Sequence, residues 1–333
     1  MVLIYSWTKK EIKQIIRITE TILKKFNRLT IIKMKKNFLF LFILVLSLSL
    51  LSCKNNVKYL EDEKAGIEYY KKGVYDKALT SLEKANSLGS ADAAYYLGEM
   101  FRQGRGVDKN YSVACRYYQK SAEGDNKKAY LNAGMCHISD KKDENEFKEA
   151  FKWFKRTAEK INEMDLGETE RKDFFVKFGI MYFAGLGTLQ DFSEAAKWFE
   201  KAAELGDVYS QGALAMLNYA GNGVLTDKKK ARYWAEKAAA QGDDTGEFVL
   251  GMLNHYSLPP EQNMQEAVKW YEKAAAQGHT AACYLLAVIY EKGEGVPQDL
   301  KKARYYYEEA AKGKYKEPKK ALQEFNTRYS YHN

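Results

Sequence analysis

The sequence predicts an all-α fold, a superhelical solenoid built from stacked helical hairpins. Proline is rare, at 4 of 333 residues, which suits long helical stretches because proline disrupts helix interiors. Small residues recur along the chain, mostly every 36 residues, and aromatic and further small residues follow each of them at fixed offsets. A chain that repeats itself with such a period is expected to stack one similar structural unit upon the next.

Six repeats share four positions. Each repeat has a small residue, an alanine sixteen residues later, an aromatic residue three residues beyond the alanine, and then a second small residue. The spacing is 36 residues except between the second and third repeats, where it is 45, and we attribute the difference to a nine-residue insertion near residues 162–172. In chain order, the first small residues are Gly98, Gly134, Gly179, Ala215, Gly251 and Ala287, the alanines are Ala114, Ala150, Ala195, Ala231, Ala267 and Ala303, the aromatic residues are Tyr117, Trp153, Trp198, Trp234, Trp270 and Tyr306, and the second small residues are Ser121, Thr157, Ala202, Ala238, Ala274 and Ala310.

Each repeat is expected to fold as helix, loop, helix. The third repeat has paired loop glycines, Gly185 and Gly187, and glycine tolerates the positive φ that lets a chain turn back sharply. The second helix is expected to end at a glycine in three repeats, at positions 206, 242 and 278. The first small residue is expected where the two helices cross, beside an aromatic residue of the second helix.

Two segments carry a resemblance to a known family. LGEMFRQGRGV (97–107) and WYEKAAAQG (270–278) resemble the Sel-one-like repeat, a relative of the tetratricopeptide repeat. The resemblance implies a right-handed superhelix of helical hairpins and a role in binding other proteins. It covers most of the chain that follows the leader.

The resemblance also suggests how this part of the chain is divided. Residues 61–90 are interpreted as one tetratricopeptide-like hairpin, because Gly66 and Ala78 lie only twelve residues apart. Residues 91–315 are interpreted as six Sel-one-like repeats. Residues 316–333 are interpreted as a capping helix and tail, since the last repeat of a solenoid has no neighbour to cover it.

The leader resembles that of a bacterial lipoprotein. Residues 34–52 combine two early lysines with a 14-residue, mostly apolar run, which is shorter than the roughly 20 residues that a membrane-spanning helix needs. Cys53 follows at the position of a lipobox cysteine, so the resemblance implies cleavage before Cys53, its lipidation, and a location in the bacterial cell envelope, on the periplasmic or cell-surface side of a membrane. The alternative is a plain N-terminal anchor helix with a chance cysteine.

Two short segments flank this leader. Residues 1–33 are interpreted as an upstream extension or a misassigned start, with translation beginning at Met34, and a genuine cytoplasmic helix is the alternative. Residues 53–60 are interpreted as a linker. Residues 1–52 hold 10 Lys/Arg and 2 Asp/Glu, so they carry +8 of the formal net charge of +9. The remainder is nearly neutral and lacks the basic surface expected of a nucleic-acid-binding protein.

Three further cysteines, Cys115, Cys136 and Cys283, form no zinc-binding pattern. We favour free buried thiols for all three, because free cysteine behaves as a small apolar residue. A Cys115–Cys136 disulfide is the alternative in an oxidising compartment.

The sequence predicts no metal site, no cofactor and no enzyme. The histidines form no metal-binding motif; they are His137, His255, His279 and His332. The alternative function is a cell-wall-related hydrolase or a penicillin-binding, β-lactamase-like activity, to which cysteine-rich relatives of these repeats have been linked. Such enzymes use Ser-x-x-Lys, which occurs twice here, at 81–84 and 139–142, but neither match has the companion KTG or SDN motif.

The predicted function is that of a lipid-anchored, exported scaffold or adaptor that binds an unknown protein or peptide through its concave face. By analogy with tetratricopeptide repeats, this face uses the positions three before and one after the first small residue. Methionines recur there, and methionine adapts to varied partners. The alternative is that these positions only pack between neighbouring hairpins. The predicted face residues are Tyr95, Leu131, Met135, Val176, Ile180, Met216, Phe248, Met252, Tyr284 and Val288.

Overall fold

The structure, a computed structural model, describes residues 17, 21, 60–138, 143–258, 262–313 and 316–329. These residues form helices joined by short loops and contain no strand, which confirms the all-α fold class. Among them, no helix has both the length and the apolar character needed to cross a membrane. The predictions for residues 1–33 and 34–52 and for Cys53 lie outside the described residues. Only Arg17 and Thr21 of this part of the chain are described, and both are helical.

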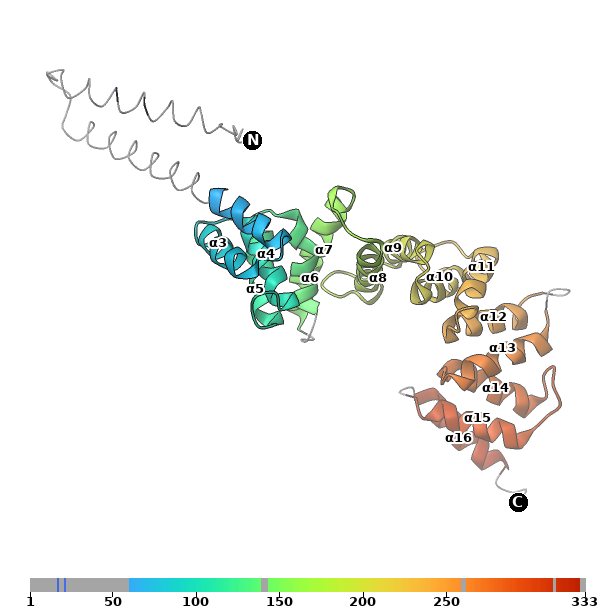
Figure 1. Cartoon of the computed structure of the whole chain (residues 1–333). Coiled ribbons are helices and arrows are strands. Elements are labelled where there is room, and N and C mark those ends of the chain that lie inside the picture. Colours follow the sequence, from blue (N-terminus) through green and yellow to red (C-terminus); the bar gives the residue numbers. More distant parts are fainter. Residues whose placement is uncertain are drawn as a thin grey trace, which may run out of the picture. The chain divides into compact units, whose positions relative to one another are not determined.

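The helices follow one another as antiparallel pairs (Figure 1). Residues 60–71 form the first described helix. The helices after it are α3 (Tyr75–Ser87), α4 (Ala91–Gln103), α5 (Tyr111–Glu123), α6 (Lys127–Ile138), α7 (Glu144–Lys160), the short 3₁₀ helix η1 (Ile161–Glu163), α8 (Glu168–Ala184), α9 (Phe192–Glu204), α10 (Val208–Ala220), α11 (Lys228–Ala239), α12 (Asp244–His255), α13 (Met264–Ala276), α14 (Thr280–Lys292), α15 (Leu300–Ala311) and α16 (Lys316–Tyr329).

The chain divides into two compact units. The first unit comprises residues 1–139 and 156–164, and the second comprises residues 140–155 and 165–333. Helix α7 contributes its first part to the second unit and its last turns to the first unit. In the second unit, α8 pairs with α9, α10 with α11, α12 with α13, and α14 with α15. Each pair packs on the next, which is the stacking expected of a solenoid.

Small residues lie where paired helices cross. A Cβ atom added at Gly98 would lie 2.7 Å from the ring of Tyr118, and one added at Gly179 would lie 2.7 Å from the ring of Phe199. Since real Cβ contacts are longer, only a small residue leaves room for these rings.

An aromatic residue of the second helix lies at each of these crossings, as expected, and it is the residue that follows the repeating aromatic position. The ring beside Gly179 belongs to Phe199 and not to Trp198. Trp198 instead packs against Phe178, with ring centroids 4.9 Å apart, and Lys201 covers its ring. One step along a helix turns a side chain by about 100°, so neighbouring aromatic residues contact different partners.

The loop glycines adopt the predicted left-handed conformation. Gly185 has φ 69° and Gly187 has φ 68°, and a side chain on Gly187 would collide with the backbone at Phe147. The next helix begins at once, because the side chain of Asp191 accepts hydrogen bonds from two backbone N–H groups of α9 at 2.9 Å. Aspartate is a favoured N-cap residue for this reason.

The cysteines correct one expectation. Cys115 on α5 and Cys136 on α6 form a disulfide with an S–S distance of 2.03 Å, so the favoured reading of free thiols was wrong for this pair. Their helices are consecutive in the first unit and pack together, which brings residues 21 apart in sequence into bonding distance. Cys283 is free and buried, and burial raises the pKa of its thiol.

Candidate functional site

The ten predicted face residues all lie on the first helices of their hairpins, from α4 to α14. None of them is exposed. Leu131, Phe248 and Met252 are buried, at 6%, 7% and 9% exposure. The other seven, Tyr95, Met135, Val176, Ile180, Met216, Tyr284 and Val288, are half-buried.

Packing between hairpins accounts for much of this burial. Ile180, Met216 and Val288 each pack against the buried core of the second unit. Phe248 stacks on the His279 ring at a centroid distance of 4.3 Å. The face residues therefore have a structural role, and the seven half-buried ones also retain surface that a partner could contact. Whether they bind one stays a prediction.

Glu99 follows Gly98 directly, at the same repeat position as Met135 and Ile180, and it is buried at 8% exposure. Its carboxylate accepts hydrogen bonds from the Tyr118 hydroxyl at 2.6 Å and from the Arg102 guanidinium at 2.7 Å. Burial alone would raise the pKa of Glu99, but these hydrogen bonds outweigh burial and hold its pKa below the ordinary value. Glu99 is thus a satisfied, ionised residue at this position and is not available to a ligand.

Asp243, the residue that precedes α12, lies beside a face position and was missed by the sequence analysis. Its carboxylate lies beside Gly212, where an added Cβ atom would be 2.7 Å from a carboxylate oxygen. Burial, reinforced by Asp244, raises the pKa of Asp243 to about 6. The available signal was Gly212 itself, because the equivalent position in the other repeats carries a large apolar residue.

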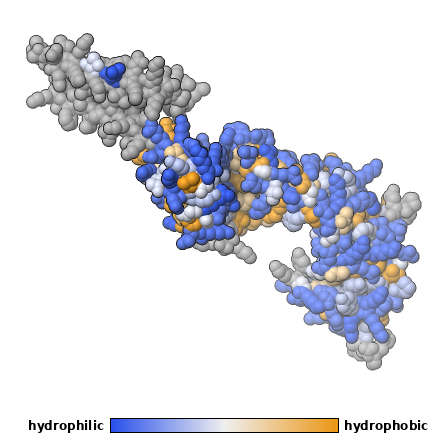
Figure 2. All heavy atoms as spheres, in the orientation of Figure 1, coloured by the Kyte–Doolittle hydropathy of each residue, from blue (hydrophilic) through white to orange (hydrophobic). Residues whose placement is uncertain are grey.

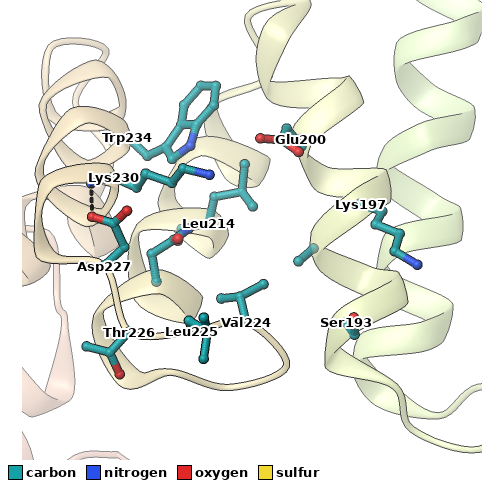
Figure 3. Close-up of a pocket in the computed structure, with 12 residues that line it drawn as sticks. Ser193, Lys197, Glu200, Leu214, Val224, Leu225, Thr226, Asp227, Lys230 and Trp234 are labelled. Atoms are coloured by element: carbon teal, nitrogen blue, oxygen red, sulfur yellow. Dashed lines mark hydrogen bonds between the residues drawn. The ribbon is translucent and has the colours of Figure 1, made fainter.

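A pocket of about 550 Å³ lies in the second unit between α9 and α11 (Figure 3). Helix α10 forms its floor with Leu214 and Asn218, and the loop before α11 closes one side. Its lining residues are Ser193, Ala196, Lys197, Glu200, Leu214, Asn218, Val224, Leu225, Thr226, Asp227, Lys230 and Trp234. The sequence analysis did not identify this pocket, although the run of three lysines at 228–230 was a visible signal.

Figure 2 shows hydrophilic residues over most of the coloured surface on this side of the molecule, with hydrophobic ones among them. The most exposed large apolar side chains that the structure describes are Leu189, Leu225 and Leu258, and all three lie in loops between paired helices of the second unit.

The serines, lysines and histidines considered for catalysis or metal binding do not form a site in the part of the chain that the structure describes. Ser81 and Lys84 both lie on α3, and no hydrogen bond joins their side chains in the described structure; Ser139 and Lys142 lie outside it. His279 caps α14 by accepting a hydrogen bond from the backbone N–H of Ala282 at 3.2 Å. Over the residues that can be described, no three His, Cys, Asp or Glu side chains are grouped closely enough to hold a metal ion.

Comparison with protein families gives repeated matches over more than half of the chain. The family model described as Sel1 repeat matches residues 91–126, 128–162, 178–207, 208–243, 246–279 and 280–315. These are the six repeats predicted from the 36-residue spacing. No curated protein matches the chain.

Solved structures give a similar result. A protective antigen present in uropathogenic Escherichia coli strains, displaying an SLR fold, is 26% identical with a TM-score of 0.55; the alignment covers 81% of this chain and 57% of that one. The chain therefore spans little more than half the length of this relative. A Sel1 repeat protein from Oxalobacter formigenes is 28% identical with a TM-score of 0.46, and the alignment covers 75% of this chain and 99% of that one.

Proposed function

The chain belongs to the Sel1 repeat family, and from that premise we propose that it is a lipid-anchored, exported scaffold that binds another protein or peptide through its first-helix face. Sel1 repeat proteins are in general protein-interaction scaffolds, which gives the coarse class of this chain. The anchor, the export and the binding face are the finer parts of the proposal. The hydrolase alternative receives no support from the residues around Ser81.

One observation supports the proposal that the first-helix face binds a partner. In the second unit, half-buried apolar side chains recur at the same position of three first helices, at Ile180, Met216 and Val288, and on the first helix between the last two this position is held by the buried Met252. Side chains of this kind on neighbouring hairpins form a continuous apolar strip, and an extended segment or a helix can lie along such a strip. Met216 adds a side chain that adapts its shape to a partner.

The face is tested by capture from envelope extracts with the full-length chain as bait. Near-isosteric polar changes, Ile180→Thr, Met216→Gln and Val288→Thr, remove apolar contact area while limiting strain in the fold. The matched control changes exposed second-helix residues of the same unit, Tyr233→Gln and Tyr305→Gln. We expect the triple variant to lose its specific partner and the control to keep it, with helicity unchanged in both. An identical set of partners for the two variants would argue against this face.

The envelope location rests on the leader and on one structural feature. Residues 34–53 have the charge, apolar run and cysteine expected of a lipoprotein signal. The Cys115–Cys136 disulfide is consistent with export, because disulfides persist in oxidising compartments and are rare in the cytosol. Together they support anchoring of the chain through Cys53 on the periplasmic or cell-surface side of a membrane.

The anchor is tested by changing Cys53→Ala. We expect the parent chain to be found in the membrane fraction with acyl chains at its mature N-terminus, measured by mass spectrometry of the N-terminal peptide. The variant should lose both the acyl mass and the membrane association. Cys283→Ala is the matched control and should change neither. An unmodified Cys53 in the parent chain would refute the lipid anchor.

A further inference from the structure

We propose that the pocket between α9 and α11 binds an acidic segment of a partner protein, with a carboxylate held by Lys230 and the indole N–H of Trp234 and an apolar side chain resting on Leu225. This pocket is distinct from the first-helix face, because its walls come from the second helices of two successive repeats. Its volume of about 550 Å³ lies within the range of small-ligand sites and suits a short run of peptide side chains.

The first turn of α11 carries three lysines and no acidic residue. Lys228, Lys229 and Lys230 are all exposed, and the structure, where described, gives their ammonium groups no ion pair. The N-terminal end of a helix bears a partial positive charge, so lysines there are unfavourable. The residues equivalent to Lys230 in α9 and α13 are Glu194 and Glu266, which fit the helix better, whereas α15 carries a lysine there as α11 does. An anion bound beside Lys230 would offset this repulsion.

The nearby carboxylate of Asp227 does not neutralise these lysines. Its Oδ1 atom accepts hydrogen bonds from the backbone N–H groups of Lys229 and Lys230, both at 3.0 Å, and thereby caps the helix (Figure 3). Lys197, on the opposite wall, is already paired with Glu194 at 2.6 Å. Lys230 is therefore the lining cation that remains available to a ligand.

The indole of Trp234 lines the same pocket. Trp234 is only 7% exposed, and within the described part of the chain no hydrogen bond uses its indole N–H. Its indole nitrogen lies on the side of the ring nearest Lys230 and Leu214 (Figure 3). A carboxylate oxygen in the pocket would accept a hydrogen bond from this N–H group, and a hydrogen bond to a charged acceptor is stronger than one to a neutral acceptor.

The other lining residues restrict where the carboxylate can bind. Glu200 lines the α9 side of the pocket and would repel an anion placed against that wall. Ser193 and Thr226 offer hydroxyl groups near the loop, which suit the amide groups of a peptide backbone. The arrangement therefore favours a carboxylate on the α11 side.

Leu225 supplies an apolar contact beside the polar recess. It is 91% exposed, more than any other large hydrophobic residue that the structure describes, and it stands on the loop that closes the pocket. An acidic residue flanked by leucine in a partner would place its carboxylate in the recess and its neighbour on Leu225. A lipid surface fits less well for two reasons. The indole N–H is recessed. The two other loops with highly exposed leucines, Leu189 and Leu258, lead into helices that begin without lysines, so the combination of leucine and lysines is not repeated along the unit.

The test uses the full-length chain in non-ionic detergent and two dye-labelled peptides. One peptide has the core Leu-Asp-Asp-Leu and the other has Leu-Asn-Asn-Leu, so they differ only in charge. The test variant, Lys229→Ser with Lys230→Glu, copies the Ser193–Glu194 pair of α9. The matched control, Lys301→Ser with Lys302→Glu, makes the same change at the same helix positions of α15, two repeats later.

Fluorescence anisotropy should show the acidic peptide binding at least tenfold more tightly than the neutral one. The α11 variant should lose at least tenfold in affinity, the α15 control less than twofold, and added salt should weaken binding. The α11 variant should melt no lower than the parent, since glutamate suits a helix N-terminus, so lost binding would not reflect unfolding.

Three results would overturn the proposal. The first is no binding of the acidic peptide at millimolar concentration, and the second is equal binding of both peptides. The third is a pair of observations: the parent chain binds phosphatidylglycerol vesicles and the α11 variant does not, while both bind the acidic peptide equally well. That result would assign the lysines to a membrane surface.

Discussion

At the scale of single residues, the repeat depends on which side chains face each helix crossing. Sequence periodicity located the small residues correctly, because only glycine or alanine fits there. It did not identify the aromatic partners, since two adjacent aromatic positions follow the same period and only the packed structure separates them. The ring that meets Gly251 belongs to Tyr271, while the neighbouring Trp270 stacks with Lys273.

Enlarging Gly251 should therefore destabilise the second unit in a graded way. An added Cβ atom would collide with the buried ring of Tyr271. Gly251→Val should lower the free energy of unfolding by about 1–3 kcal/mol through overpacking. Gly251→Ala should cost less, because Ala287 is accommodated at the equivalent position beside Tyr307. Urea denaturation followed by circular dichroism measures both, and equal costs for the two variants would contradict the crossing geometry.

Asp243 should make stability depend on pH. Its folded pKa of about 6 lies above the ordinary value of 3.8, chiefly because burial disfavours the charged form. The folded state therefore binds more protons than the unfolded state between these values, so stability from this group is fully present below pH 3.8 and is lost as pH rises through 6.

The comparison that checks this uses Asp243→Asn. Thermal melting of the parent chain and the variant, measured at several pH values between 4 and 7, should show the variant gaining stability relative to the parent as pH rises. Asp244→Asn should reduce the pH dependence of the parent chain without abolishing it, because Asp244 adds to the effect of burial on the pKa of Asp243. A difference between parent and Asp243→Asn that does not vary with pH would contradict a raised pKa.

At the scale of helices and loops, hydrophobic pattern and caps made the hairpins predictable. The paired loop glycines and the aspartates that begin α9, α11 and α15 fix the turns before these helices through local chemistry. The disulfide between α5 and α6 was not favoured, because cysteine spacing alone does not reveal which helix faces meet. The pocket beside α11 was also missed, since it depends on side chains from three helices.

The Cys115–Cys136 disulfide should stabilise the first unit. It closes a loop between residues 21 apart in sequence, and a loop of this size corresponds to about 3 kcal/mol in the chain-entropy account. Cys115→Ser with Cys136→Ser should lower the free energy of unfolding by about that amount. A reducing agent should have the same effect on the parent chain and none on the double variant, as measured by urea denaturation. Equal stability of oxidised and reduced parent chains would mean that the cysteines are not joined.

At the scale of the whole molecule, a repeat array is predictable because each repeat mainly contacts its neighbours. The division into two compact units was not predicted. It falls within α7 and around the nine-residue insertion, where the 36-residue spacing is interrupted. The binding face could be predicted only as a hypothesis, because residues that pack between hairpins and residues that line a groove share the same apolar pattern.

The measurement that tests the scaffold most directly is site-specific photo-crosslinking in living cells. A benzophenone amino acid placed at position 216 on α10 should crosslink to a partner protein, because Met216 retains surface on the first-helix face. The same group at position 305 on α15, an exposed second-helix site that does not line the α9–α11 pocket, should give no such product. A partner crosslinked from 305 and not from 216 would contradict the claim that this protein binds through its first helices.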